Sequence, residues 1–291
     1  MPLSSPWDAG APGTGSPHGP RAALDLGSSR VRAGVPAREL IIDRPASLPV
    51  PGGRRPPRPR GGDADHLAAG GDAPRLRPIR HGMVADSRAC AHLARRTLLE
   101  ATGAARPREV LLAVPAAAGG VDRQRAVAAV RAAAGCPVRL ADAPLAAVAG
   151  AGRPIGDPLA QLVMDIGAEI IEMAVIVDGR VEHARSVQYL PDRVPGRARP
   201  RIPESVRDRS ADELRRMLAD LPARRRGPVR ARGLLLTGGG ALLPSLPGWL
   251  TTRLAMPVQI APDPARATIR GLARLCLAPA AVRAAAAPRV H

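Results

Sequence analysis

The sequence predicts an α/β protein built from two similar halves. Strands and helices alternate along most of the chain, which is typical of layered α/β folds. Each half opens with a strand that runs into an Asp-x-Gly turn, at residues 25–27 and 165–167. The chain has no Phe and only 1% aromatic residues. Its core must therefore be built from Ala, Val, Leu and Ile, which suits buried strands packed against Ala-rich helices.

The first half is expected to begin with three short strands and to continue as alternating helices and strands. Gly103 and Gly135 are expected to end two of the helices, since glycine readily takes the left-handed conformation of a helix C-cap. The predicted strands are 21–27, 30–35, 38–43, 109–115 and 137–142, and the predicted helices are 85–103, 121–135 and 143–152.

The second half repeats this order and is expected to meet the first half at a cleft. Ser210 is the predicted N-cap of a helix, with Glu213 at the capping-box position. Pro264 is placed in the first turn of the last helix. The predicted strands are 160–167, 169–179, 180–190, 232–237 and 257–262, and the predicted helical segments are 210–221, 241–255 and 263–278.

Composition excludes several classes of protein. The net charge is +18, and all 43 basic residues are Arg. This basicity indicates either a GC-rich coding sequence or attraction to nucleic acid or an anionic lipid surface. The three cysteines have neither metal nor disulfide spacing, which fits a reducing cytoplasm. Residues 1–20 do not read as a signal peptide, and no apolar run approaches the roughly 18 residues that a membrane span needs.

The two Asp-x-Gly turns would suit a nucleotide polyphosphate if they faced each other. Backbone N–H groups in such turns point at phosphate oxygens, and Asp25 and Asp165 would hold Mg²⁺ through water. A third glycine-rich stretch, Gly238 to Gly240, lies between a strand and a helical segment. It would bring bare backbone and a helix N-terminus close to the same ligand.

Six stretches resemble, in the family's order, the bacterial actin homologue MreB and its Mbl relatives, within the actin, sugar-kinase and heat-shock-chaperone fold. They run from about Ala22 to Cys276 and are "LDLGSSRVRAGV", "LRPIRHGMVAD", "VLLAVPAAAGGVDRQRAV", "LADAPLAAVAGAG", "VMDIGAEIIEMAVI" and "GLLLTGGGALLPSL". The resemblance implies an α/β, actin-like two-domain ATPase fold with a reduced second-domain subdomain.

The resemblance also implies a domain division. Domain I covers residues 21–157, with a Pro/Arg-rich insert at about 50–78 and a returning helix at 264–279. Domain II covers residues 158–263, with a truncated subdomain at about 191–232. A disordered tail is expected at 1–20 and a second tail at 280–291. Only one helix is expected in the truncated subdomain.

Site residues follow from the same resemblance. Asp122 lies near the family's water-activating Glu, although a first-turn acidic residue is also favoured by the helix dipole alone. Asp142 matches an acidic position of the cleft, and Asp25 and Asp165 are the expected Mg²⁺ ligands through water. The implied nucleotide-binding residues are Asp25, Gly27, Ser28 and Ser29 in the first phosphate loop, Asp165 and Gly167 in the second, and Gly238, Gly239 and Gly240 in the base loop.

The second phosphate loop departs from the family. Ala168, Glu169, Ile170 and Ile171 stand where the family has Gly, Gly, Thr and Thr. Glu169 is also expected to place a carboxylate near phosphate. At about 5 Å and an effective dielectric of about 20, one such repulsion costs roughly 3 kcal/mol, which weakens binding about a hundredfold.

Three functions are therefore weighed. The first is an MreB-like cytoskeletal protein for cell shape and cell-wall morphogenesis, with weakened binding of ATP and Mg²⁺ and weak or lost hydrolysis. The second is a non-hydrolysing pseudo-ATPase that co-assembles with or regulates a full-length relative. The third is an Arg-rich nucleic-acid binder, which lacks a recognised motif and stacking aromatics. The expected partners are a second copy or a full-length relative and cell-wall morphogenesis proteins, in the cytoplasm or at the inner membrane face.

Overall fold

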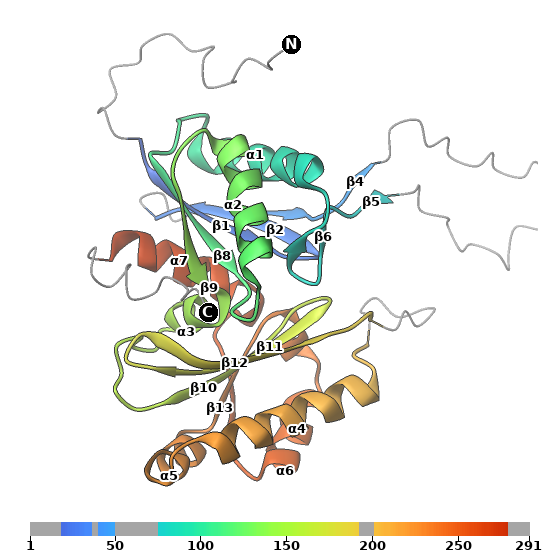
Figure 1. The fold of residues 1–291 in the computed structure, drawn as a ribbon, viewed down its shortest axis with the longest axis vertical. Coiled ribbons are helices and arrows are strands. Elements are labelled where there is room, and N and C mark those ends of the chain that lie inside the picture. Colours follow the sequence, from blue (N-terminus) through green and yellow to red (C-terminus); the bar gives the residue numbers. More distant parts are fainter. Residues whose placement is uncertain (1–18, 37–39, 50–74, 192–200, 279–291) are drawn as a thin grey trace, which may run out of the picture.

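The computed structural model describes residues 19–36, 40–49, 75–191 and 201–278. Within them the chain forms two lobes, each with a five-stranded sheet, stacked one above the other (Figure 1). The predicted tails at 1–20 and 280–291 and the insert at about 50–78 lie wholly or almost wholly outside the described residues.

The two sheets have the same topology. In each, three antiparallel strands come first in the chain. A later strand adds in parallel beside the first strand, and one more adds in parallel beside that strand. This confirms the doubled pattern that the sequence predicts. The first sheet has the order β3 (Leu40–Pro45), β2 (Arg30–Val35), β1 (Arg21–Leu26), β8 (Glu109–Val114), β9 (Val138–Asp142), and the second has β12 (Arg180–Gln188), β11 (Ile170–Val177), β10 (Gln161–Ile166), β13 (Leu234–Thr237), β14 (Val258–Ile260).

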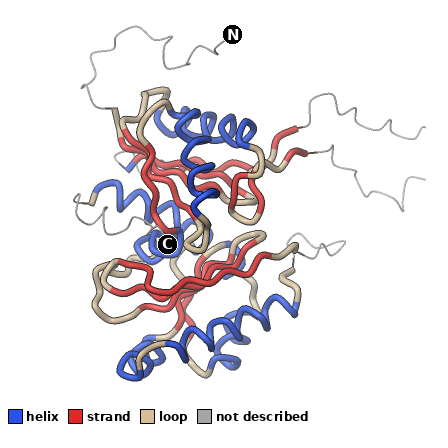
Figure 2. The backbone as a smooth tube through the Cα atoms, in the orientation of Figure 1, coloured by secondary structure: helices blue, strands red, loops and turns tan. Residues whose placement is uncertain are grey.

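Helices cover the outer face of each sheet (Figure 2). On the first lobe, α1 (Ser87–Thr102) and α2 (Gly120–Ala134) bury Ala- and Leu-rich faces against the strands. On the second lobe, α4 (Glu204–Asp220) and α6 (Leu246–Leu254) bury Leu-containing faces, and α5 (Ala223–Arg232) contributes only Val229 to the core. No helix among the described residues has both the length and the apolar content to cross a bilayer.

A pair of helices fills the space between the sheets. α3 (Ala143–Gly150) and α7 (Ala267–Leu277) pack against each other and against buried residues of both sheets, such as Leu111 and Val163. The two helices cross at Gly150 and Gly271, where a Cβ atom on either glycine would collide with a backbone carbonyl of the other helix. The close crossing therefore requires glycine on both sides.

Most predicted elements are confirmed, including the left-handed C-caps at Gly103 and Gly135, whose φ angles are 61° and 63°. The last predicted helix divides into a short 3-10 turn, η3 (Pro264–Arg266), and α7. The short strands that the sequence did not predict are β4 (Leu48–Pro49), β5 (Arg75–Leu76), β6 (Ile79–Arg80) and β7 (Met83–Val84), and a 3-10 turn, η2 (Gly239–Leu242), follows β13.

The prediction for residues 191–232 is wrong in two respects. This segment holds two helices, α4 and α5, where one was expected. Ser210 is not an N-cap, because α4 begins six residues earlier, after Pro203. The Ser210 hydroxyl instead donates to the Val206 carbonyl at 2.7 Å within the helix. Pro203 is the N-cap residue and supplies no side-chain hydrogen bond to the first turn, in which Glu204 is the acidic residue that the helix dipole favours.

Replacing Gly271 with Ala should lower the free energy of unfolding by about 1–3 kcal/mol, because overpacking at a close helix crossing forces the two helices apart. Gly227→Ala in α5 is the matched control, since a Cβ there meets nothing within 4 Å and alanine favours a helix by up to about 1 kcal/mol. Urea unfolding of both variants measures the difference. Equal stability of the two variants would contradict this account of the crossing.

Candidate functional site

A cavity of about 750 Å³ opens between the two lobes. Strand ends from both sheets and the loop after β13 line it, as does Thr268 at the start of α7. The structure thus brings the three glycine-rich stretches together in one cleft. All nine residues implied for nucleotide binding line this cavity: Asp25, Gly27, Ser28, Ser29, Asp165, Gly167, Gly238, Gly239 and Gly240.

The two Asp-x-Gly turns have the same geometry. The Gly27 N–H donates to the Arg30 carbonyl at 3.0 Å, and the Gly167 N–H donates to the Ile170 carbonyl at 2.9 Å. A Cβ on either glycine would lie about 3 Å from that same carbonyl oxygen, at 2.9 and 3.0 Å respectively. Glycine is needed here for close approach, since neither residue has a positive φ angle.

Gly238 has a different role. Its φ angle is +80°, in the region that favours glycine. A Cβ at this position would collide with the Asp165 carboxylate and the Ile166 carbonyl. The loop after β13 therefore packs directly on the second Asp-x-Gly turn and closes that side of the cavity.

Burial controls the charge of the acidic groups in the cavity. Burial raises the pKa of Asp165 to about 6, and the neighbouring Asp25 carboxylate adds to this rise. Burial also raises the pKa of Asp25 above its ordinary value, although Arg32 acts against the shift. The two aspartates thus lie close enough to interact, as the sequence predicts.

Glu172 is a third acidic residue in the cavity, and sequence reasoning missed it. It pairs in register with Asp165 across β10 and β11, and its carboxylate accepts a hydrogen bond from the Ala116 N–H at 2.8 Å. Burial and then Asp165 raise the pKa of Glu172 to about 8. The available signal was a lone carboxylate within an otherwise apolar strand, since all eight residues of β11 are buried.

Two predicted residues are not brought to this cavity. Asp122 lies in the first turn of α2 and is not among the residues that line it, which fits the helix-dipole interpretation. Asp142 is buried at the end of β9, 3.7 Å from the Arg123 guanidinium, and burial raises its pKa to about 6. Asp142 lines a second cavity of about 1000 Å³, between α2 and β12.

Comparison with known proteins matches this chain to one family. The sequence profile described as MreB/Mbl protein matches residues 20–196 and 201–283. The chain belongs to the MreB/Mbl family. Cell shape-determining protein MreB of Escherichia coli (strain K12) is 24% identical over 316 residues, which cover 86% of this chain and 91% of that relative. The MreB of Pasteurella multocida (strain Pm70) is 24% identical over 323 residues, covering 86% and 90%.

Solved structures show the same actin-like fold. MreB5 of Spiroplasma citri bound to ADP superimposes with a TM-score of 0.68 at 18% identity, covering 87% of this chain and 94% of the other. The AMPPNP-bound form of MreB5 gives 0.68 at 19% identity, covering 89% and 95%. The MamK double helical filament gives 0.68 at 14% identity, covering 89% and 99%.

Glu169 is one of the departures from the MreB family pattern. The sequence led us to expect its carboxylate near phosphate, but Glu169 is not among the residues that line the cavity. Its side chain is only 2% exposed and forms an ion pair with Arg77. One carboxylate oxygen also accepts a hydrogen bond from the His81 N–H at 3.1 Å. The carboxylate is paired with residues of the first lobe, among them Arg77, which itself lines the cavity, so this ion pair offsets the expected repulsion of phosphate.

The hairpin of β6 and β7, which we call the His81 hairpin (residues 77–84), contacts both phosphate-type loops. It holds the second loop through Glu169, and the His81 ring Nδ1 lies 3.0 Å from the Glu169 carbonyl oxygen. It holds the first loop through Ser28, whose hydroxyl accepts from the Gly82 N–H at 2.8 Å and whose carbonyl accepts from Arg77 at 3.3 Å. The His81 hairpin thus ties the two lobes together beside the cavity.

The acidic groups do not fit the expected Mg²⁺ site well. Asp25 already faces the Arg32 guanidinium, with 3.4 Å between Arg32 Nη1 and Asp25 Oδ2. No cluster of three His, Cys, Asp or Glu residues suited to a metal occurs in the described part of the chain. Mg²⁺ bound through water needs fewer protein ligands, so a water-mediated ion at Asp25 and Asp165 stays a prediction.

Arg77→Leu should destabilise the protein by roughly 3 kcal/mol, because it leaves the Glu169 carboxylate buried without its cation. Adding Glu169→Gly to Arg77→Leu should restore part of the loss, since the buried charge is then gone. Thermal and urea unfolding of the single and double variants measure both effects.

Arg44→Leu is the matched control for this ion pair. Arg44 pairs with Glu100, but both side chains are about 40% exposed, at 38% and 42%. Exposed pairs contribute about 0–1 kcal/mol, so this variant should be nearly as stable as the parent. Equal losses of unfolding free energy in Arg77→Leu and Arg44→Leu would show that the buried Arg77–Glu169 pair stabilises the protein no more than an exposed pair does.

Proposed function

We propose that this chain is a cytoskeletal member of the MreB family whose cleft binds a nucleotide weakly and hydrolyses it slowly or not at all. The observation that carries the proposal is the 750 Å³ cavity, which three glycine-rich loops from both lobes line. The similar MreB5 structures are described as bound to ADP and to AMPPNP. Their likeness to this chain supports a nucleotide as the ligand.

The second phosphate loop supports the weakened binding. Ile171 is buried in the core of the second lobe, and Glu169 is occupied in the bridge to Arg77. The Ile170 methyl group packs beside Gly82 of the His81 hairpin. Two residues where the resemblance implies threonine hydroxyls are therefore used for packing, and the loop offers fewer donors to phosphate.

The acidic groups of the cleft support slow hydrolysis. A general base must be ionised and within hydrogen-bond reach of the water that it activates. Asp122 does not line the cavity. Glu172 does, but its pKa of about 8 keeps it mostly protonated at neutral pH. Neither carboxyl group is thus well suited to take a proton from water.

Calorimetry with ADP in the presence of Mg²⁺ tests the proposal, with the MreB of Escherichia coli measured alongside. Binding to this chain should be detectable but at least about tenfold weaker, because a lost hydrogen bond to a charged group costs about 1.5–3 kcal/mol. Phosphate release from ATP should be slower than for the relative. Equal affinity with equal turnover would contradict the weakened cleft.

Two variants locate the binding. Gly239 lines the cavity, and a Cβ there meets nothing within 4 Å, so Gly239→Leu should fill the cavity without disturbing the fold and should remove the ADP signal. Gly227→Leu in α5 is the matched control, because its surroundings are also open. If Gly239→Leu binds ADP as the parent does, the nucleotide does not occupy this cavity.

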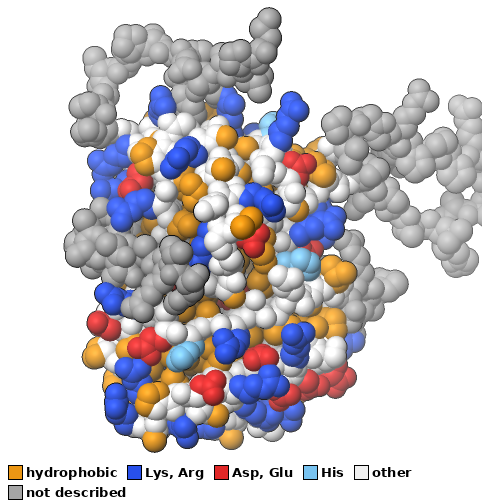
Figure 3. All heavy atoms as spheres, viewed as in Figure 1, with side chains coloured by type: hydrophobic (Ala, Val, Ile, Leu, Met, Phe, Trp, Pro, Cys, Tyr) orange, Lys and Arg blue, Asp and Glu red, His pale blue; other side chains and the backbone are white. Residues whose placement is uncertain are grey.

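Arginine distribution does not favour the nucleic-acid alternative. Figure 3 shows Arg side chains dispersed over this face of both lobes, with acidic groups among them. Several arginines of the described residues are paired within the protein, as in the Arg225–Glu182 and Arg232–Asp157 pairs. Nucleic-acid binders gather such charges into a patch or stripe, so the basic composition does not by itself support that function.

The proposed partners are other members of the family, in the cytoplasm or at the inner face of the membrane. A similar structure, that of MamK, is described as a double helical filament. In this chain α4 and α5 occupy the place where the resemblance implies a larger subdomain that helps make filament contacts. The reduced surface supports co-assembly with a full-length relative rather than long filaments of this chain alone.

Sedimentation tests this assembly. The purified chain should stay in the supernatant with ATP, because one of its filament-forming surfaces is small. It should enter the pellet when mixed with a polymerising relative such as the MreB of Escherichia coli. Ordered filaments of the chain alone in negative-stain images, or no co-sedimentation with the relative, would contradict the proposal.

A further inference from the structure

An arginine lies beside the first of the two paired aspartates. Arg32 on β2 is the register partner of Asp25 on β1, and its Nη1 lies 3.4 Å from Asp25 Oδ2. Both side chains are mostly buried, with 14% and 16% exposure, and both line the cavity between the lobes. A positive charge is therefore built into the cleft where the sequence led us to expect a metal ion.

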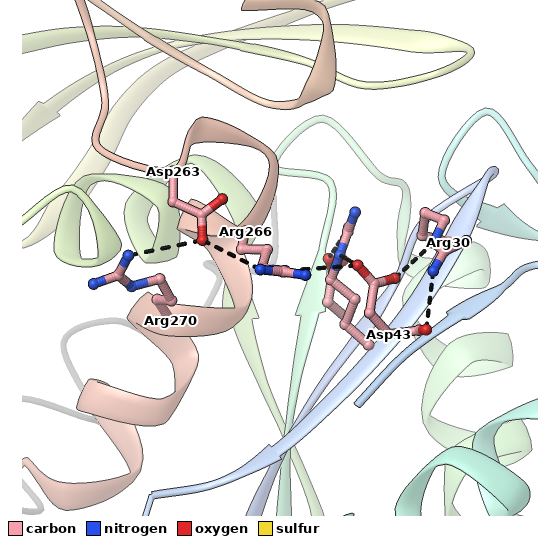
Figure 4. Close-up of polar contacts among 7 residues, drawn as sticks. Arg30, Asp43, Asp263, Arg266 and Arg270 are labelled. Carbon is pink, nitrogen blue, oxygen red and sulfur yellow. Dashed lines mark hydrogen bonds and ion pairs between the residues drawn. The ribbon is translucent and has the colours of Figure 1, made fainter. Parts of the chain in front are cut away.

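A network of ion pairs around Asp43 fixes Arg32 in this place, and Figure 4 shows Asp43 with Arg30 and Arg266 on either side. Arg32 Nε lies 3.1 Å from Asp43 Oδ2, and Arg30 Nε lies 2.6 Å from Asp43 Oδ1. Burial opposes the charge of Asp43, but Arg30 and Arg32 together hold its pKa below the ordinary value. The ionised Asp43 thus anchors the Arg32 guanidinium, which is not free to swing away from the cavity.

The same network continues from β3 to the 3-10 turn η3 and the start of α7. Arg266 lies 3.8 Å from both Asp43 and Asp263, and Arg270 lies 3.8 Å from Asp263. With Arg30, Arg32 and Asp25, the seven residues contain four guanidinium groups and three carboxylates. The network therefore has a positive charge in excess, and a bound anion can balance it.

We propose that Arg32 takes the place of the magnesium ion, so that the cleft binds a nucleoside diphosphate without a divalent cation. This inference rests on the proposed nucleotide binding and adds how the phosphate charge is neutralised. A guanidinium has five N–H donors in a planar fork that matches phosphate oxygens. The contacts to Asp25 and Asp43 engage two of its nitrogens, Nη1 and Nε.

The surroundings of Arg32 fit an anion better than a second cation. Arg30, Arg77 and Arg201 also line the cavity, beside Asp165 and Glu172, whose pKa values are raised by burial to about 6 and about 8. A metal ion at Asp25 would have to compete with a guanidinium that is already paired with the same carboxylate. A phosphate group would instead meet a positive charge that is held in position before binding, so little reorganisation is needed.

The experiment is ADP calorimetry in EDTA and in Mg²⁺ on the full chain. The parent should bind ADP with the same affinity, within about twofold, under both conditions. Arg32→Leu should bind ADP about 10- to 100-fold more weakly in EDTA, because it loses a charge-assisted contact. Mg²⁺ should recover part of this loss in Arg32→Leu, since Asp25 is then available to the ion. A residue with a merely structural role would not create this dependence on Mg²⁺.

Two further variants control for folding and charge. Arg44→Leu removes an arginine of the same sheet that pairs on the surface with Glu100, and it should bind ADP as the parent does. Arg32→Lys keeps the positive charge, so it should keep binding that is independent of Mg²⁺, at reduced affinity. Circular dichroism melts of each variant identify any that does not fold, and the comparison of the parent in EDTA and Mg²⁺ needs no variant.

Each other outcome overturns a defined part of the inference. If the parent binds ADP only with Mg²⁺, Arg32 does not replace the metal, although the proposed nucleotide binding stands. If folded Arg32→Leu binds ADP in EDTA as tightly as the parent, a different group neutralises the phosphates. If the parent binds no ADP under either condition, both the inference and the proposed nucleotide binding fail.

Discussion

The glycine crossing of α3 and α7 is the constraint on which the rest of the structure depends. These two helices form a middle layer on which both sheets rest, so their separation sets the distance between the lobes. Gly150 and Gly271 allow backbone to meet backbone. A larger residue would widen this layer and move the first strand of one sheet away from the first strand of the other. The paired Asp-x-Gly turns meet at one cavity because the layer is this thin.

The two Asp-x-Gly turns of the cleft share one backbone geometry, but the residues that follow them make different contacts. Both turns close with the same N–H to carbonyl hydrogen bond, and the glycines that make this geometry possible are present. The residues after Gly167, however, serve the interior of the second lobe and the contact with the first. The turn geometry at Gly167 therefore does not depend on which residues follow it in the loop.

Strand order, helix caps and the convergence of the glycine-rich turns could be predicted from the sequence because they depend on local patterns. Periodic apolar residues and Gly103 or Gly135 mark their elements without help from distant parts of the chain. The start of α4 was missed because its first turns are charged and follow a Pro/Arg-rich stretch. α5 was missed because Pro228 and five arginines in ten residues resemble a basic loop.

The contacts that decide the chemistry of the cleft were beyond local patterns. Arg32 and Asp25 face each other only because the hairpin register pairs them. Arg77 and Glu169 come from different lobes and are 92 residues apart in the sequence. From the sequence alone, the Glu169 carboxylate is expected to repel phosphate, because its partner Arg77 is far away along the chain. Residue types alone therefore predicted which loops meet at the cavity, but they did not predict that the Glu169 charge is paired with Arg77.

The His81 hairpin has a mechanical consequence. Because it grips both phosphate-type loops at once, any rotation of one lobe against the other must first expose the Glu169 carboxylate. These contacts oppose a change in the angle between the lobes, whatever occupies the cleft. In a polymer with other family members, such a chain would keep the same arrangement of its lobes whatever nucleotide its neighbours hold.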